Sequence, residues 1–152
     1  MDPEHHRGLE RAYLAAPCNA EFDPRIEVGD GRARVRLRIE PRHFHGGGAL
    51  HGHVLFKALD DAAFFAANAV VRDELVLTQA FSLHFLRPVR GAWIESEGRV
   101  VHRARRVVVA EAVVLDERAR EVARGTGTFL PGGLPLDDVP GYPSSDRGVT
   151  NA

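Results

Sequence analysis

The stretch HFHGGGALHGHVLFKALDDAAFFAANAV, residues 43–70, joins a loop of histidines and glycines to the longest helix candidate in the chain. Residues 51–69 are rich in alanine, leucine and phenylalanine and contain no proline, a composition that favours helix. On a helical wheel the polar side chains fall in one stripe about 100° wide, joined only by Phe64; they are His53, Lys57, Asp60, Asp61 and Asn68. Because the remaining circumference is apolar, other elements must surround this helix.

The segments around this helix show the alternation that is typical of β-strands. Residues 33–39 alternate strictly after the turn signal at residues 29–31, which predicts a hairpin within residues 25–39. Four more strand candidates follow the helix, at residues 75–86, 92–102, 105–116 and 121–130. The pattern predicts an α+β protein, with a curved antiparallel sheet wrapped around one long central helix.

The two ends of the chain differ in character. Residues 3–16 have Leu9 and Tyr13 at helical spacing, and Pro17 ends the pattern, which predicts a short amphipathic helix on the surface. From Pro131 onward, four prolines and four glycines in 22 residues indicate a tail without its own core. We therefore expect one domain over residues 1–130 and a C-terminal tail over residues 131–152. Removing residues 133–152 should leave the fold intact.

Composition and charge exclude several classes of protein. A length of 152 residues fits one domain, and 44% hydrophobic with 27% charged residues is an ordinary globular composition. A net charge of −1 gives no field that attracts nucleic acid, and the single cysteine, Cys18, excludes an intrachain disulfide. No apolar run approaches the roughly 18 residues that span a bilayer, and the N-terminus lacks an apolar signal segment. We expect a cytoplasmic protein that binds neither nucleic acid nor membranes.

Three short motifs occur at informative spacing: His51-Gly52 with Asp60 nine positions after the histidine, Phe85-Leu86-Arg87-Pro88 at a strand end, and Gly127-Thr128-Phe129 in the last strand. Over roughly residues 25–130 the chain resembles hotdog-fold acyl-CoA thioesterases of the phenylacetate-pathway type. The resemblance implies the hotdog fold, hydrolysis of an acyl- or aryl-CoA thioester, and a homodimer or homotetramer. It implies no cofactor and no metal, since coenzyme A is part of the substrate.

The resemblance also implies roles for single residues. Asp60 would be the base or nucleophile, His51 a positioning residue beside the oxyanion hole, and Thr78 a hydroxyl that orients water from the neighbouring subunit. Two positions depart from the family pattern: its second helix-mouth glycine is His53 here, and its asparagine six residues before the first histidine is His45. An imidazole can also hydrogen-bond a carbonyl or a water, so His45 stays a candidate site residue.

Elementary chemistry supports the same site. Thioester hydrolysis needs a carboxylate to activate water or attack the carbonyl, and donors aimed at the oxyanion that develops. As the first residue of the helix, Gly52 has an N–H without an intrahelical partner, and its missing side chain allows a close approach. At the turn over residues 102–106, Ala104 and Arg105 match a small and a basic residue of the family. Arg105 and Arg106 are therefore candidates to bind the phosphates of coenzyme A.

Other interpretations remain open. Lys57 and Asp61 could pair on a solvated helix face, with Asp60 beside them and no catalytic role. The opening at residues 43–46 resembles that of hotdog dehydratases, which act on 3-hydroxyacyl thioesters, but it aligns Lys57 with their catalytic acid. The chain could also be a non-catalytic acyl-CoA-binding hotdog protein. The histidine pairs 43/45 and 51/53 invite a metal interpretation, although i and i+2 diverge by about 200° on a helix.

Overall fold

The long helix predicted from the sequence is present as α2, Gly52–Asn68, in a computed structural model that describes residues 2–143. His51 is its N-cap: its backbone is extended, and its ring nitrogen Nδ1 accepts a hydrogen bond from the His53 N–H at 2.9 Å. Most side chains of α2 are buried, as its apolar circumference requires. No helix within the described range is both long and apolar enough to cross a bilayer.

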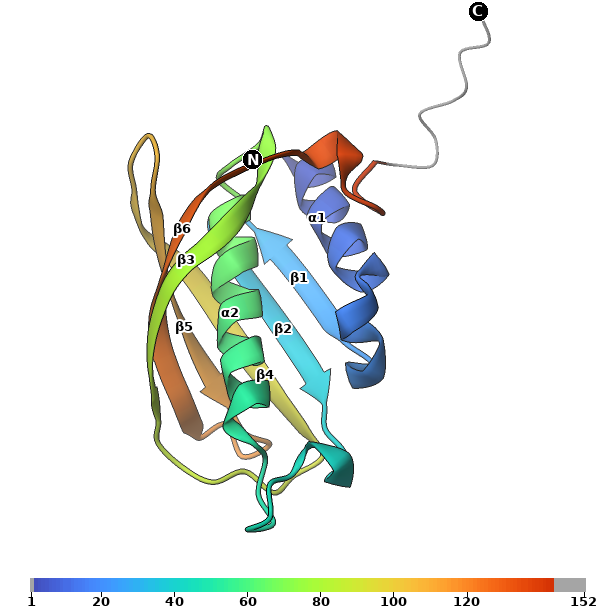
Figure 1. The fold of residues 1–152 in the computed structure, drawn as a ribbon, viewed down its shortest axis with the longest axis vertical. Coiled ribbons are helices and arrows are strands. Elements are labelled where there is room, and N and C mark those ends of the chain that lie inside the picture. The colour runs from blue at the N-terminus through green and yellow to red at the C-terminus, as the bar shows by residue number, and fades with distance from the viewer. Residues whose placement is uncertain (1, 144–152) are drawn as a thin grey trace, which may run out of the picture.

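A six-stranded antiparallel sheet curves around α2 (Figure 1). Its strand order is β1-β2-β4-β5-β6-β3, so that β3 forms one edge and the β1–β2 hairpin forms the other. This architecture confirms the predicted α+β hotdog fold. The strands are β1 Arg25–Gly29, β2 Arg32–Arg38, β3 Glu74–Phe85, β4 Trp93–Arg103, β5 Val108–Leu115 and β6 Glu121–Pro135.

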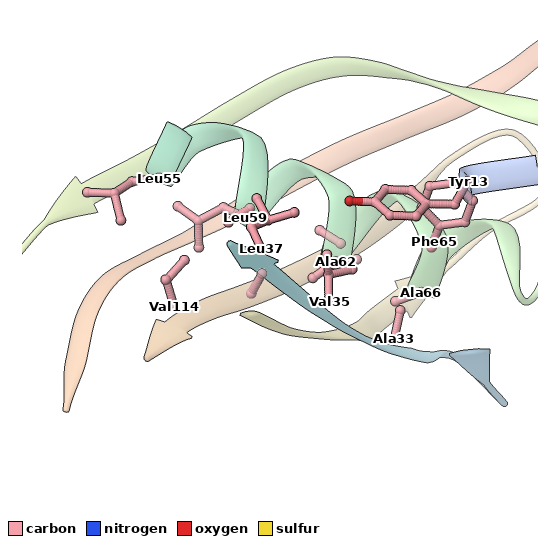
Figure 2. Packing of buried hydrophobic residues seen from close by; sticks show 14 of the residues in the cluster. Tyr13, Ala33, Val35, Leu37, Leu55, Leu59, Ala62, Phe65, Ala66 and Val114 are labelled. Atoms are coloured by element: carbon pink, nitrogen blue, oxygen red, sulfur yellow. The ribbon is translucent and has the colours of Figure 1, made fainter. Parts of the chain in front are cut away.

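One buried cluster joins α2 to the concave face of the sheet (Figure 2). Leu59 and Ala62 of α2 and Leu37 of β2 are all 0% exposed. Strand β4 lies closest to the helix, because a Cβ atom at Gly98 would stand 2.2 Å from the carbonyl oxygen of Ala62. A glycine in the strand therefore lets the helix backbone rest directly on the sheet.

The predicted N-terminal helix is present as α1, Pro3–Ala15, and a 3-10 helix, η1, follows at Pro17–Phe22. The apolar face of α1 is buried: Leu9 and Tyr13 are 0% and 2% exposed. The Tyr13 ring meets the edge of Phe65 on α2 at a centroid distance of 5.2 Å. The α1–η1 segment thus covers part of the central helix.

The C-terminal boundary differs from the prediction. Strand β6 continues past residue 130 to Pro135, and Leu136 is only 2% exposed. Beyond Phe129, β6 is paired with β3 alone, so its prolines fall where the strand has one free side. Residues 131–136 therefore belong to the domain, and removing residues from 133 onward would cut into it. The predicted tail over residues 144–152 lies outside the described residues.

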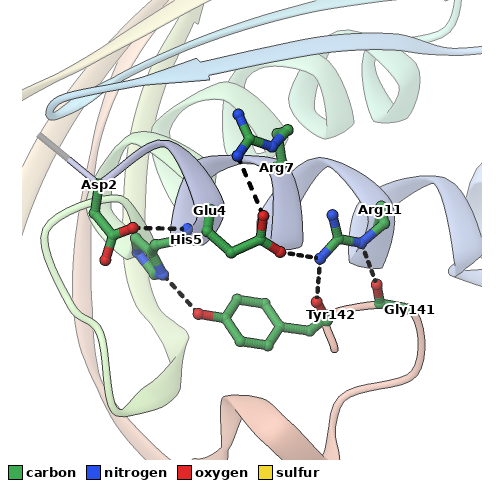
Figure 3. Close-up of polar contacts among 7 residues, drawn as sticks. All are labelled: Asp2, Glu4, His5, Arg7, Arg11, Gly141 and Tyr142. Carbon is green, nitrogen blue, oxygen red and sulfur yellow. Dashed lines mark hydrogen bonds and ion pairs between the residues drawn. The ribbon is translucent and has the colours of Figure 1, made fainter. Parts of the chain in front are cut away.

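Polar contacts tie the end of the described chain to α1 (Figure 3). The Tyr142 hydroxyl lies 2.8 Å from His5 Nδ1, and the opposite ring nitrogen of His5 lies 2.9 Å from the carbonyl oxygen of Asn68. Arg11 donates to the carbonyl oxygens of Gly141 and Tyr142 at 3.2 and 2.8 Å. Residues 136–142 therefore lie over the N-terminal helix and hold the end of the described chain against it.

Candidate functional site

The N-terminus of α2 opens on a pocket of about 510 Å³, and three of the predicted site residues, His45, His51 and Gly52, line it together. Being the first helical residue, Gly52 has an N–H that no group within residues 2–143 accepts. The Phe85 ring lies over it, because a Cβ at position 52 would stand 2.8 Å from Phe85 Cζ. The other lining residues are Ala49, Leu50, Leu55 and residues 85–88.

The histidines at this pocket are held in defined orientations. His51 Nδ1 accepts from the His53 N–H and lies 2.8 Å from His53 Nδ1. His45 Nδ1 accepts from the Gly47 N–H at 2.9 Å. A neutral imidazole that accepts at Nδ1 carries its proton on Nε2. His45 and His51 are both exposed, and each can therefore offer an Nε2–H donor at the mouth of α2.

Asp60 lies half-buried on the side of α2 that faces β3. Thr78 Oγ1 donates to Asp60 Oδ1 at 2.9 Å within the same chain. Thr78 and Asp60 thus meet within one chain, and the expected role of Thr78 towards a neighbouring subunit stays a prediction. Burial raises the pKa of the Asp60 carboxyl, and the bond from Thr78 partly offsets that effect. No residue between 2 and 143 donates to Oδ2, so this oxygen is available to a water or a substrate.

Asp61 has a different environment from its neighbour. Its Oδ2 accepts from Lys57 Nζ at 2.9 Å and from the Tyr13 hydroxyl at 2.8 Å. The ion pair foreseen between Lys57 and Asp61 is thus present, but it lies under the N-terminal segment rather than on a solvated face. Burial raises the pKa of Asp61, and the lysine opposes that shift. Asp61 is therefore engaged in structural contacts with Lys57 and Tyr13, whereas the hydrogen-bond partner of Asp60, Thr78, is neutral.

The two halves of the predicted site are apart within one chain. Asp60 lies eight residues beyond Gly52 on a straight helix, which separates them by about 12 Å along its axis. Neither Asp60 nor Thr78 lines the pocket at the helix mouth. The Gly52 N–H and the Asp60 carboxylate of one chain therefore cannot both contact one thioester carbonyl.

The predicted phosphate-binding arginines lie at the other end of the domain. Arg105 lines a pocket of about 460 Å³ with Arg72 and Arg103, beside the C-terminal end of α2. Arg106 is exposed next to it but does not line the pocket. The structure therefore brings Arg105 together with Arg103 of the same turn and with Arg72, which the sequence did not single out.

His43 does not take part in the helix-mouth pocket. Its side chain is 4% exposed, stacks on Phe22 at a centroid distance of 4.7 Å, and has Nε2 3.2 Å from Glu21. This placement speaks against the dehydratase alternative, which depends on that histidine. Within residues 2–143 no three His, Cys, Asp or Glu side chains are grouped so that they could hold a metal ion.

Three contacts around the site were not foreseen from the sequence: the Phe85 ring over Gly52, and the bonds that Tyr13 and Asn19 make to the Asp61–Lys57 pair. The spacing of Lys57 and Asp61 predicted their pairing. Nothing local indicates that residues more than thirty positions earlier would complete it, because that contact depends on how α1 packs.

Comparisons with known proteins agree with this fold. A family model described as "Thioesterase superfamily" matches residues 47–123. A Saccharolobus solfataricus protein, named as a candidate esterase, is 27% identical over 100 residues, which cover 66% of this chain and 67% of that protein. The structure of a conserved Pseudomonas aeruginosa protein is 28% identical, with a TM-score of 0.74, covering 80% of this chain and 98% of its own. The E. coli PaaI protein from the phenylacetic acid degradation operon shares the fold at 21% identity and a TM-score of 0.77, covering 86% and 97%.

Proposed function

The chain belongs to the thioesterase superfamily, and from that premise we propose that it hydrolyses an acyl- or aryl-CoA thioester to the free acid and coenzyme A. One observation carries the proposal. An unpartnered backbone donor at Gly52 and an available carboxylate oxygen at Asp60 lie on one helix, about 12 Å apart. Those are the two groups that thioester hydrolysis needs, and a second copy of the chain can bring them together.

The proposed active unit is a symmetric dimer. If Gly52 of one chain faces Asp60 of its partner, twofold symmetry places the two α2 helices antiparallel, with residue 56 at the crossing. Phe56 is 38% exposed there and meets Phe81 of β3 at a centroid distance of 5.5 Å. The outer edge of β3 has no strand partner within the described chain. Pairing of the two β3 edges would cover this edge and the Phe56 side chain together.

In this dimer each chain supplies half of two identical sites. The Gly52 N–H and the Nε2–H of His51 polarise the thioester carbonyl, aided by the positive end of the α2 dipole. The partner's Asp60 uses Oδ2 to activate water or to attack the carbonyl, while Thr78 of that same partner chain fixes Oδ1. His45 lies beside the mouth and can donate to the water or the carbonyl. As a base, Asp60 takes a proton from the attacking water and passes it to the thiolate of coenzyme A as the C–S bond breaks. As a nucleophile, it forms a mixed anhydride and releases coenzyme A, and water then hydrolyses the anhydride to the free acid.

The second pocket fits the nucleotide end of the substrate. The helix ends at Asn68, eight residues or about 12 Å beyond Asp60, and Val71, which lines the pocket, follows three residues later. An extended pantetheine arm can cover that span from the reacting carbonyl. Arg105 and Arg103 offer positive charge to the phosphates, and Arg106 stands next to them. Arg72 lines the same pocket but is paired with Asp2, and Asp73 and Glu74 line it as well.

Thiol release from a panel of acyl- and aryl-CoA substrates tests the proposed function. Asp60→Asn should remove most hydrolysis, since an amide of nearly equal volume is neither base nor nucleophile. Asp61→Asn is the matched control and should lose far less. Wild-type thiol release by the Asp60 variant would contradict the proposal. Coenzyme A binding without turnover would instead indicate the non-catalytic alternative.

Sedimentation tests the assembly. A dimer or tetramer at micromolar concentration is expected, and a monomer that still hydrolyses thioesters would contradict the shared site. The cytoplasmic location, the lack of a cofactor or metal, and the lack of nucleic-acid and membrane partners remain predictions.

A further inference from the structure

The buried pair beside Asp60 is held from two sides. Lys57 Nζ lies 2.9 Å from Asp61 Oδ2 and 2.5 Å from the side-chain oxygen of Asn19. It also stands 5.8 and 5.7 Å from the ring centroids of Tyr13 and Phe22. The Lys57 and Asp61 side chains are only 19% and 15% exposed. The ammonium group is therefore enclosed by residues of the N-terminal segment.

Lys57 has two carboxylates within reach on its own helix. Asp60 lies three residues after it and Asp61 four, and both spacings bring side chains together on a helix surface. The contacts from outside α2 all favour pairing of Lys57 with Asp61 over pairing with Asp60. Asn19 accepts from the ammonium and the Tyr13 hydroxyl donates to Asp61, so that the lysine is drawn to Asp61. Among residues 2–143, Thr78 is then the only residue that donates a hydrogen bond to the Asp60 carboxylate.

The N-terminal segment is anchored firmly enough to keep Lys57 paired with Asp61. The Asn19 side-chain amide donates to the carbonyl oxygen of Tyr13 at 2.7 Å, and Asn19 itself is 3% exposed. Tyr13 is 2% exposed and packs against Phe65. The family match begins only at residue 47, so these contacts come from a part of the chain outside it.

We propose that the N-terminal segment, residues 3–22, controls the basicity of Asp60 by holding Lys57 on Asp61 and so withholding it from Asp60. Asn19, Tyr13, Lys57 and Asp61 are positioning residues in this arrangement, and none of them lines the pocket at the helix mouth. The inference rests on the proposed function, because it concerns the same carboxylate.

The physical consequence is a stronger base at Asp60. An opposite charge within hydrogen-bonding distance lowers a carboxyl pKa by about 1 to 3 units. Asp60 escapes that pairing, and burial together with the neighbouring Asp61 charge raises its pKa. A carboxylate whose pKa lies closer to the working pH accepts a proton from water more effectively. The groups that act on the Asp60 carboxyl are Thr78 from β3 and Asp61 and Lys57 from α2.

The test is the acid limb of the pH profile of kcat/KM for thiol release. In Asp61→Asn the lysine loses its carboxylate partner and pairs with Asp60 instead. The acid limb should therefore move to lower pH by about one unit. Adding Lys57→Met should move it back up, and by more than Lys57→Met alone moves the limb of the wild type, where the lysine is held on Asp61. Asn19→Ala should likewise lower the limb, but not when Lys57→Met is also present. Thermal melts identify any variant that is unfolded.

A purely structural role predicts a different pattern. Activity would then fall at every pH in proportion to lost stability, and Lys57→Met would move the acid limb by the same amount in the wild type and in Asp61→Asn. That result overturns the inference, provided that Asp60→Asn still abolishes hydrolysis. If Asp60→Asn retains hydrolysis, the proposed function itself has failed.

Discussion

Gly52→Pro removes the proposed oxyanion donor with little cost to the fold. Proline is favoured at the first position of a helix, where its missing N–H has no intrahelical role. His51, at φ −65° and ψ 142°, already has the backbone conformation that is preferred before a proline. The new ring approaches Phe85, whose Cζ would lie 2.8 Å from a Cβ at position 52. Phe85 is 56% exposed, so its side chain has room to turn aside.

The expected loss follows from the donor alone. Removing one oxyanion-hole donor typically lowers kcat by about 10² to 10³-fold. Gly52→Ala is the control, since it adds the same Cβ but keeps the N–H; any loss it shows measures the Cβ alone and should be much smaller than that of the proline variant. The assay is thiol release at saturating substrate, with thermal melts of both variants. If the proline variant is as active as the alanine variant, the Gly52 N–H is not the donor and the reasoning fails.

Three further outcomes concern stability. Gly98→Ala should cost about 1 to 3 kcal/mol in urea unfolding, because its Cβ would collide with the Ala62 backbone; unchanged stability would show that α2 can move off the sheet. Leu136→Ala should cost about 2 to 5 kcal/mol, as for other buried leucines, and a neutral result would restore the idea of a separate tail from residue 131. Burial lowers the pKa of His5, so its contribution is complete above the unfolded histidine pKa of about 6.5 and is lost as the pH falls towards the folded pKa. Melting temperatures at pH 7.5 and 5.5 should therefore differ less in His5→Gln than in wild type, and an equal difference would exclude this contribution.

The sequence was sufficient for the elements whose pattern is local. The apolar circumference of α2 and the alternation of residues 33–39 predicted the central helix and the hairpin, because each reports which face is buried. At the C-terminus the prolines and glycines led to a wrong prediction of where the domain ends. They indicated a tail at residues 131–136, whereas the long β3 strand and the one-sided pairing beyond Phe129 allow prolines in a strand.

The sequence proposed candidate site residues but could not indicate how they are arranged. Gly52 and Asp60 follow from motif spacing, and their roles remain a proposal. The direction of Thr78 and the enclosure of Lys57 depend on tertiary packing between segments far apart in the chain. No spacing rule foretells which of two adjacent aspartates the N-terminal segment will occupy.

The central claim is that each site combines Gly52 of one chain with Asp60 of its partner, and complementation tests it most directly. Gly52→Pro and Asp60→Asn chains, each nearly inactive alone, are unfolded, mixed in equal amounts and refolded together. Half of the dimers then hold one chain of each kind, and each of these has one intact site, so about a quarter of wild-type thiol release should return. A mixture no more active than the two variants alone would contradict the shared site.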